Sequence, residues 1–234
     1  MPVIIDGKKT SEEIKNEIAN RVQEIKANGG KVPHLAAVLV GEDPASQTYV
    51  GAKVKACEQV GYASTLVRLG EGVSEEELLA KVEEINENPD IDGLIVQLPL
   101  PGHISVENVT AKLKPEKDVD GFTPANVGRM VLNWPAYVSA TPFGIVELLK
   151  RYRIETSGKH CLVIGRSHIV GSPVSILLAR NADPGNCTVT LAHSRTRNLK
   201  ELAQTADILV VALGKPGFVT ADMVKEGAVV IDVG

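Results

Sequence analysis

The sequence predicts an α/β protein of two domains, each built on a parallel sheet. Strand and helix signals alternate along nearly all of the 234 residues, as expected for βαβ units. The length corresponds to between one and two domains, at about 150 residues each. Aromatic residues make up only 3% of the chain, so the apolar runs consist of Val, Ile, Leu and Ala. Such runs are typical of parallel strands buried on both faces.

Capping signals locate the helices of the first half. Asp43 and Pro44 predict a helix start, and Gly61 predicts its end, because these residue types favour those positions. Thr10 with Glu13, and Ser74 with Glu77, have the spacing of a capping box. The expected order is an apolar run at 3–5, a helix at 10–27, a strand at 35–40, a helix at 43–60, a strand at 65–69, a helix at 74–86, a strand at 94–98 and a short helix at 106–113.

The second half continues the alternation after a stretch of weak periodicity at 126–140, where the domain boundary is expected. The domains are then 1–139 and 140–234. The expected elements are helices at 142–152, 173–180, 199–203 and 221–225, and strands at 161–164, 189–192, 208–213 and 229–233. No internal repeat is evident. Because an apolar strand rarely closes a domain, we expect the polypeptide to continue past Gly234, or another segment to pack there.

Composition and charge argue against several classes of protein. The net charge is −4, whereas proteins that bind nucleic acids or membrane surfaces usually carry a basic excess. The N-terminus lacks the features of a signal peptide, and no apolar run approaches the roughly 20 residues that span a bilayer. The three cysteines and five histidines show no metal-ligand spacing. We therefore expect a reduced cytoplasmic protein without a metal.

A glycine-containing turn joins the strand at 161–164 to the next helix, as in dinucleotide-binding folds. Gly165 is expected to permit the tight turn, and Gly171 to let the backbone approach a pyrophosphate at the helix N-terminus. Arg166, Ser167 and Val170 lie in the same turn. The full G-x-G-x-x-G pattern is absent, and a plain βα turn accounts for the pattern about equally well.

The end of the next strand favours NADP over NAD. NAD enzymes place an acidic residue roughly 20 residues after the glycines, where it binds the ribose hydroxyl. Ser194 and Arg195 occupy that region here, and Arg166 can reach it. A hydroxyl and guanidinium groups suit a 2′-phosphate. The alternative is that Arg195 and Arg197 are solvated surface charges.

The first half contains a candidate acid–base centre. Tyr49 and Lys53 are spaced to share one helix face, although such pairs are also common on exposed surfaces. A lysine acts in acid–base chemistry only when burial or neighbours lower its pKa. Gln97 ends an apolar strand, where α/β proteins bind ligands. Asp120 either occupies a simple turn or holds the edge of a 2-aminopyrimidinone ring.

Six motifs occur in an order that resembles one family. They are Ser-x-x-Tyr-Val-x-x-Lys at 46–53, IVQLPLP at 95–101, KDVDGF at 117–122, TPFG at 141–144, GRSHIVGSP at 165–173 and VIDVG at 230–234. Together they cover essentially the whole chain. The sequence closely resembles the bifunctional methylenetetrahydrofolate dehydrogenase/cyclohydrolase family, called FolD in bacteria.

The resemblance implies an NADP-dependent oxidation of 5,10-methylenetetrahydrofolate to the 5,10-methenyl form, followed by hydrolysis to 10-formyltetrahydrofolate. Lys53 would be the acid–base residue and Gln97 would tune it. Tyr49 would stack on the folate and Asp120 would anchor the pterin ring. Folate would bind to the N-terminal domain, with Leu98 and Pro99 also in contact with the substrate.

The resemblance also implies a cleft between the two domains and a Rossmann-like NADP domain at the C-terminal end. Its expected cofactor contacts are Gly165, Arg166, Ser167, Val170, Gly171, Ser194 and Arg195. It further implies a homodimer joined through this domain. The family usually continues through a Pro-Gly-Gly-Val-Gly-Pro segment and a returning helix, which are not in this sequence. Ala140 stands where many members have cysteine, so the reaction is not expected to need that thiol.

The motifs argue against two other enzyme families, and two alternative functions stay open. Short-chain dehydrogenases also use Tyr-x-x-x-Lys, but there the pair follows the dinucleotide motif, whereas Tyr49 and Lys53 precede Gly165. A shikimate-dehydrogenase-like enzyme would not account for IVQLPLP or KDVDGF. A family member with only one of the two activities, or a non-catalytic regulator that binds NADP or folate, stays open.

Overall fold

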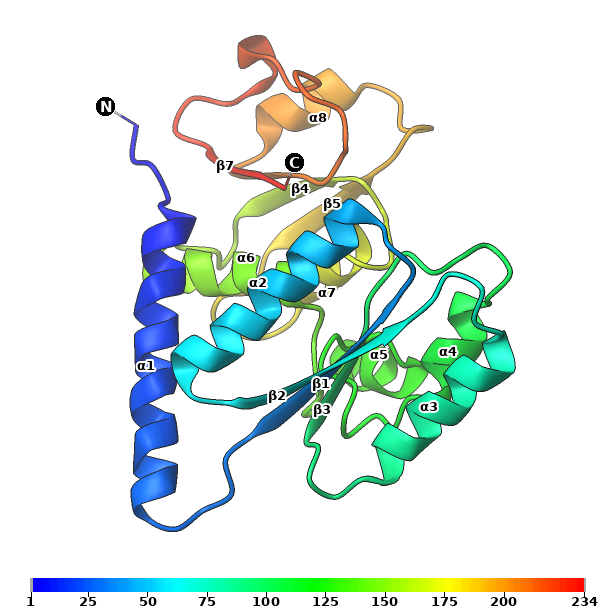
Figure 1. The fold of residues 1–234 in the computed structure, drawn as a ribbon. Coiled ribbons are helices and arrows are strands. Elements are labelled where there is room, and N and C mark those ends of the chain that lie inside the picture. Colours follow the sequence, from blue (N-terminus) through cyan, green and yellow to red (C-terminus); the bar gives the residue numbers. More distant parts are fainter. Residues whose placement is uncertain (1, 234) are drawn as a thin grey trace. The chain divides into compact units, whose positions relative to one another are not determined.

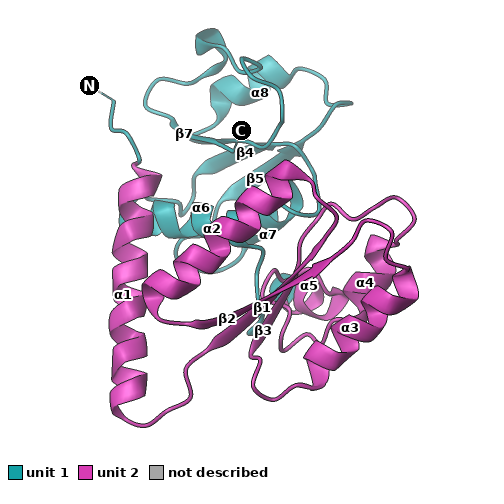
Figure 2. Cartoon of the chain, in the orientation of Figure 1, with its two compact units in different colours: residues 1–5, 130–234 teal, residues 6–129 magenta. Residues whose placement is uncertain are grey.

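The chain forms two compact α/β units in the computed structural model, which describes residues 2–233. Unit 2 comprises residues 6–129, and unit 1 comprises residues 1–5 with 130–234 (Figure 2). The prediction of two α/β bodies with parallel sheets is confirmed. The units divide at a different place from the expected boundary at 139/140, which stays a prediction.

Unit 2 is a three-stranded parallel sheet in the order β2-β1-β3 with helices on both faces (Figure 1). Alternate residues of the central strand divide between two cores. Ala36 and Val38 pack on the side of α3 and α4, whereas Ala37 and Leu39 pack on the side of α2. The elements are α1 (Gly7–Ala27), β1 (His34–Val40), α2 (Pro44–Val60), β2 (Ala63–Leu69), α3 (Glu75–Glu87), β3 (Gly93–Val96), α4 (Val106–Lys112) and α5 (Pro124–Val131), the last of which extends into unit 1.

Unit 1 is a four-stranded parallel sheet in the order β5-β4-β6-β7. Its central strand is again buried on both faces. Cys161 and Val163 face the core of α6 and α7, and Leu162 and Ile164 face the core of α8. The elements are α6 (Ala140–Arg151), β4 (His160–Ile164), α7 (Gly171–Ala179), β5 (Thr188–Ala192), α8 (Leu199–Thr205), β6 (Ile208–Val211), the 3₁₀ helix η1 (Ala221–Met223) and β7 (Val229–Asp232).

Helix α2, which carries the predicted acid–base residues, begins and ends where the sequence predicts. The Asp43 side chain accepts a hydrogen bond from the Ser46 amide at 2.7 Å, and Pro44 occupies the first turn. Gly61 ends the helix in the left-handed conformation, with φ 82°. The capping box of Ser74 and Glu77 at the start of α3 is also confirmed.

Two helix starts differ from the prediction. Helix α1 begins at Gly7, because the Asp6 side chain accepts from the Lys9 amide at 2.9 Å. Thr10 lies inside the helix and its hydroxyl donates to the Asp6 carbonyl, so the capping box predicted at Thr10 is wrong. Helix α7 begins at Gly171, two residues before Pro173.

Helix α5 was not expected from the sequence. Its two buried residues are Asn126, 1% exposed, and Met130, 3% exposed. A polar residue at one of these positions hides the apolar period of the helix. Strand β3 ends at Val96, so Gln97 and Leu98 lie in the loop that follows it. In residues 2–233, no helix is long and apolar enough to cross a membrane.

The central strand of unit 2 begins with a histidine that ties three strands together. The His34 amide donates to Asp92 Oδ2 at 2.9 Å, and the Asp92 amide donates back to the His34 carbonyl at 2.9 Å. The ring Nε2 lies 2.8 Å from the Thr65 hydroxyl on β2. These contacts hold the amino ends of all three strands in register.

Unit 1 repeats this arrangement with different residues. The His160 amide donates to Asp207 Oδ2 at 2.9 Å, the Asp207 amide donates to the His160 carbonyl at 2.9 Å, and the ring Nε2 lies 3.0 Å from the Thr190 hydroxyl. The order β5-β4-β6 also corresponds to β2-β1-β3. The two units therefore share a three-stranded framework that sequence similarity does not reveal.

Candidate active site

The predicted acid–base pair lies in unit 2 and is in contact. Lys53 projects from α2, and its Nζ donates to Oε1 of Gln97 at 3.2 Å. Gln97 directly follows β3, and its own Nε2 donates to the Leu98 carbonyl at 2.7 Å. This second bond orients the amide so that its oxygen faces Lys53. The two residues are 44 positions apart, and the sheet brings them together.

Asp120 provides the negative charge of this site. Burial raises the pKa of its carboxyl group, the positive charge of Lys53 opposes that rise, and the nearby charge of Asp118 adds to it. Asp120 also lines a small pocket with apolar residues of β3 and α4, among them Val96 and Val109. A carboxylate beside an apolar wall can accept two hydrogen bonds from a flat heterocycle.

The remaining predicted substrate residues surround this centre with different exposure. Tyr49 lies one helical turn before Lys53 on α2, and its side chain is 65% exposed. An exposed aromatic ring beside a charged centre is available for stacking on a ligand. Leu98 is partly buried and Pro99 is exposed. Both follow Gln97 in the loop after β3.

The predicted cofactor turn lies between β4 and α7 in unit 1, and neither of its two glycines has room for a Cβ. Gly165 has φ +114°, and a Cβ there would lie 2.3 Å from the Ala212 carbonyl oxygen. A Cβ on Gly171 would lie 1.9 Å from the Gly165 carbonyl oxygen. Gly171 thus permits close packing of the chain on itself, and its approach to a pyrophosphate stays a prediction.

The polar groups of the cofactor site come from two neighbouring turns. The first holds Arg166, Ser167 and Val170, and the second, after β5, holds Ser194 and Arg195. The Gly165 amide donates to the Ala192 carbonyl at 2.9 Å, so both turns leave the same edge of the sheet. Arg166, Ser194 and Arg195 are exposed.

Ser167 organises the first of these turns. Its hydroxyl oxygen accepts from the amide of Val170 at 3.1 Å and from that of Gly171 at 3.4 Å. Its hydroxyl proton remains available for a phosphate oxygen. Exposed guanidinium and hydroxyl groups beside a glycine cradle fit a phosphorylated dinucleotide.

The two units match two family models. Residues 5–120 match the tetrahydrofolate dehydrogenase/cyclohydrolase catalytic domain, and residues 139–234 match the NAD(P)-binding domain of the same enzymes. The chain belongs to the tetrahydrofolate dehydrogenase/cyclohydrolase family. The resemblance seen in the motifs is thereby confirmed.

Similarity to individual relatives supports the assignment of this chain to the tetrahydrofolate dehydrogenase/cyclohydrolase family. The bifunctional protein FolD of Cytophaga hutchinsonii is 67% identical over 231 residues, which are 99% of this chain and 80% of the relative. The crystal structure of FolD from Campylobacter jejuni is 41% identical with a TM-score of 0.94, over 99% of this chain and 81% of the other. That of the Trypanosoma brucei enzyme, complexed with NADP cofactor and inhibitor, is 36% identical with a TM-score of 0.92, over 100% and 80%.

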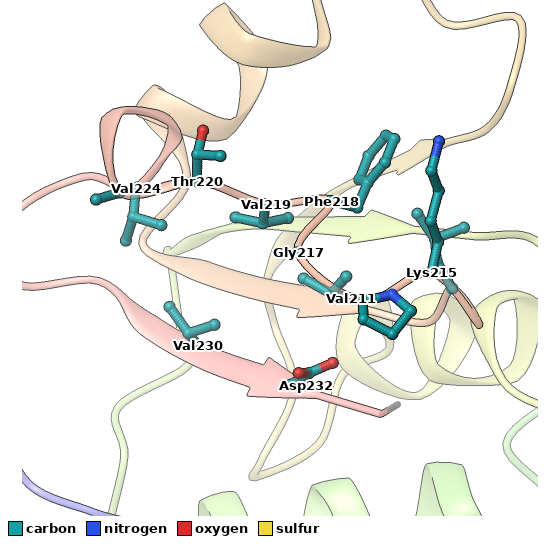
Figure 3. A pocket seen from close by; sticks show the side chains of 12 residues that line it. Val211, Lys215, Gly217, Phe218, Val219, Thr220, Val224, Val230 and Asp232 are labelled. Carbon is teal, nitrogen blue, oxygen red and sulfur yellow. The ribbon is translucent and has the colours of Figure 1, made fainter.

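A cavity of about 320 Å³, lined mainly by apolar residues, lies in unit 1. It extends from the end of β6 to β7, and Figure 3 shows Phe218 and Lys215 projecting side by side from the loop after β6. The Lys215 amino group lies 5.5 Å from the centre of the Phe218 ring. None of the predicted cofactor residues lines this cavity.

Two residues under the site escaped the sequence analysis. Asp118 is 0% exposed and Asn126 is 1% exposed, and they hydrogen-bond beneath the turn that carries Asp120. The signal in the sequence was the first aspartate of KDVDGF, two residues before Asp120. Local spacing could not show that its side chain points inward.

Proposed function

We propose that the protein oxidises 5,10-methylenetetrahydrofolate to the 5,10-methenyl form with NADP, and hydrolyses the methenyl form to 10-formyltetrahydrofolate. The observation that carries this proposal is the contact from Lys53 Nζ to Gln97 Oε1 at 3.2 Å, near the partly buried carboxyl of Asp120, in a chain of this family. It supplies an oriented acid–base group next to an anchor for the pterin ring.

In the hydrolysis, water attacks the methenyl carbon between N5 and N10. The neutral amino group of Lys53 accepts a proton from this water and returns it to N5 as the bond from carbon to N5 breaks. The hydroxyl proton of the intermediate leaves to solvent, so that formyltetrahydrofolate and one proton are formed. Gln97 holds the Lys53 amino group in place through its side-chain oxygen, and Asp120 binds the N–H groups of the pterin edge.

In the oxidation, the residues of this chain bind and orient the two reactants. NADP, when bound, supplies the hydride acceptor. Gly165 and Gly171 let the turn fold tightly, while Arg166, Ser194 and Arg195 offer charge-assisted hydrogen bonds to the 2′-phosphate. Tyr49 stacks on the folate. Positioning of this kind contributes most of what hydride transfer requires from a protein.

Several further assignments belong to the same proposal. Folate binds to residues 1–139, with Leu98 and Pro99 in contact, and NADP binds to residues 140–234, with Ser167 and Val170 in contact. The protein acts as a homodimer in the cytoplasm and does not bind nucleic acid. The motifs and the net charge of −4 support these assignments.

The activity itself is tested on the purified protein. Methylenetetrahydrofolate and NADP are supplied, and the methenyl product is followed by its absorbance. We expect product with NADP at a higher kcat/KM than with NAD. Absence of product with both cofactors would overturn the dehydrogenase assignment.

The role of Lys53 is tested by replacing it with methionine, which keeps the length but removes the amino group. We expect hydrolysis of supplied methenyltetrahydrofolate to fall at least about 100-fold, the usual contribution of a positioned acid–base group. Lys55→Met is the matched control, since Lys55 is an exposed lysine on the same helix, and it should retain the activity. Undiminished hydrolysis by Lys53→Met would remove Lys53 from its role.

A further inference from the structure

Asp118 is a buried carboxylate surrounded by N–H groups. Its side chain is 0% exposed. Oδ1 accepts from the Phe122 amide at 3.2 Å, and Oδ2 accepts from the Thr123 amide at 2.8 Å and from Asn126 Nδ2 at 3.0 Å. Burying a carboxylate is costly unless such donors surround it. These hydrogen bonds offset the cost of burial and hold the chain between residues 118 and 126 in one conformation.

The backbone held by these bonds is the turn that presents Asp120. The Gly121 amide donates to the Asp118 carbonyl at 3.1 Å, and Gly121 has φ +69°. The main chain and the side chain of Asp118 thus bind both the middle and the end of the turn. Asp120 lies between these attachments, so its direction follows from them.

The same residue connects the turn to the sheet that carries Gln97. The Leu94 amide donates to the Lys117 carbonyl at 2.6 Å, and Asp118 forms a parallel bridge with Leu94 of β3. Gln97 follows three residues after Leu94. Strand β3 therefore helps to position both Asp120 and Gln97.

Asn126 closes the arrangement from α5. Its Nδ2 donates to Asp118 Oδ2 at 3.0 Å and to the Pro115 carbonyl at 2.9 Å. Its own amide lies 3.3 Å from the Thr123 hydroxyl that accepts from it. The side-chain and main-chain amides of Asn126 thus together join the two ends of the loop from 115 to 123.

We propose that Asp118, supported by Asn126, is a positioning residue that sets the direction of the Asp120 carboxylate and thereby the affinity for the pterin ring. This inference rests on the proposed function, through the role of Asp120 as the pterin anchor. Asp118 is 0% exposed, and its carboxylate oxygens accept from the N–H groups of Phe122, Thr123 and Asn126, so it acts through the turn. A purely structural residue would affect the folded fraction of the protein and leave the affinity of the folded molecules unchanged.

The test is Asp118→Asn, which keeps the shape but replaces one accepting oxygen with a donor. We expect the KM for methylenetetrahydrofolate and for methenyltetrahydrofolate to rise about tenfold, the effect of losing one hydrogen bond to a charged group. The KM for NADP should not change. Asn126→Ala leaves the two backbone bonds of Asp118 intact, so its folate KM should rise less, and this variant serves if Asp118→Asn fails to fold.

Two controls separate positioning from general destabilisation. Asn86 is also buried, 3% exposed, and bonds the Lys112 carbonyl and the Lys114 amide. Asn86→Ala should lower the thermal midpoint without raising either folate KM. In an Asp120→Ala background, Asp118→Asn should add nothing to the folate KM, because effects that act through one group are not additive. A full additional increase there would overturn the proposal.

A readout that needs no activity distinguishes this inference from the proposed function. In Asp118→Asn, the amides of Phe122 and Thr123 should exchange faster with deuterium, and a crystal structure should show the Asp120 carboxylate displaced. If the wild-type protein converts neither folate, the proposed function fails while these two measurements still decide the positioning. Unchanged exchange and an unmoved Asp120 would overturn it.

Discussion

The carboxyl group of Asp120 lies where it lowers the stability of the protein. Burial raises its pKa, and the negative charge of Asp118 raises it further, while Lys53 opposes both. The ionised form is thus less favourable in the folded chain than in water. A group kept at such a cost is expected to serve function, as in other binding sites with perturbed carboxyls.

Asp120→Asn is therefore expected to stabilise the fold while weakening folate binding. The pKa of Asp120 in the folded protein is raised above its ordinary value of 3.8. Its contribution to the free energy of unfolding is therefore most favourable below pH 3.8, where the carboxyl is protonated, and is lost as the pH rises through the folded pKa. The variant should exceed the wild type in unfolding free energy at pH 7, and the difference should shrink as the pH falls toward 4.

Urea unfolding from pH 7 down to pH 4 measures this difference. Asp90→Asn is the matched control, because Asp90 is an exposed carboxylate of the same unit, and it should show a much smaller gain. A variant Asp120→Asn that is less stable than the wild type at pH 7 would contradict the argument.

Arg166 is the residue on which cofactor preference is expected to depend. It is exposed in the turn between β4 and α7, where a guanidinium can pair with a 2′-phosphate that NAD lacks. Arg166→Ala should raise the KM for NADP about tenfold, by the loss of a hydrogen bond to a charged group, with little change for NAD. Arg197→Ala, an exposed arginine after the second turn, is the control. Equal effects on both cofactors would remove Arg166 from the 2′-phosphate site.

At the scale of elements, the turn from β4 to α7 shows how close packing prepares a binding site. Gly165 and Gly171 have no room for a Cβ, since carbonyl oxygens lie within 2.3 Å and 1.9 Å of where it would be. The start of α7 is therefore drawn against the end of β4. The N-terminus of α7 then lies at the edge of the sheet where a pyrophosphate binds in this class of fold.

Gly165→Ala is expected to destabilise the protein and to weaken NADP binding. The new methyl group meets main-chain atoms that cannot move away cheaply, and φ +114° is unfavourable for alanine, so the loss should be at least about 2 kcal/mol. Gly214→Ala is the control, because no atom lies within 4 Å of a Cβ there. Urea unfolding measures both variants, and similar stabilities would contradict the packing argument.

At the scale of the whole molecule, two units share one design. Each has a central strand buried on both faces, a histidine at its start and an aspartate that joins it to the next strand. The buried clusters of both units consist mainly of aliphatic side chains, in agreement with the aromatic content of 3%. Because the strands of each sheet are parallel, the loops at their carboxyl ends lie at one edge of the sheet, where a ligand can bind.

Ligands are expected to protect the units separately. NADP at 100 times its Kd should stabilise the protein by about 2.7 kcal/mol, with slower deuterium exchange in the β4–α7 and β5–α8 turns. A folate should instead slow exchange around Lys53 and Asp120. Hydrogen-exchange mass spectrometry measures both, with NAD at the same concentration as the control. Protection of α2 by NADP alone, without the two turns, would contradict the assignment.

The sequence predicted the residues of the folate site but missed one helix and misplaced the start of another. The sequence located Lys53, Gln97 and Asp120 through motifs, and the structure joins Lys53 to Gln97 at 3.2 Å. It missed α5 because the buried position that should be apolar holds Asn126. The predicted capping box at Thr10 was wrong because Asp6, four residues earlier, competes for the same helix start.

What the sequence by itself determined is the alternation of strands and helices, the ends of α2 at Asp43 and Gly61, and the family. These features depend on local backbone preferences and on the order of motifs, which a chain displays without being folded. Only the tertiary structure decided that Asp118 points inward, that Gly171 makes room for the Gly165 carbonyl, and that both units share a strand framework. Each of these depends on atoms that are distant in the sequence or on the direction of a side chain, and residue types and spacing do not specify either.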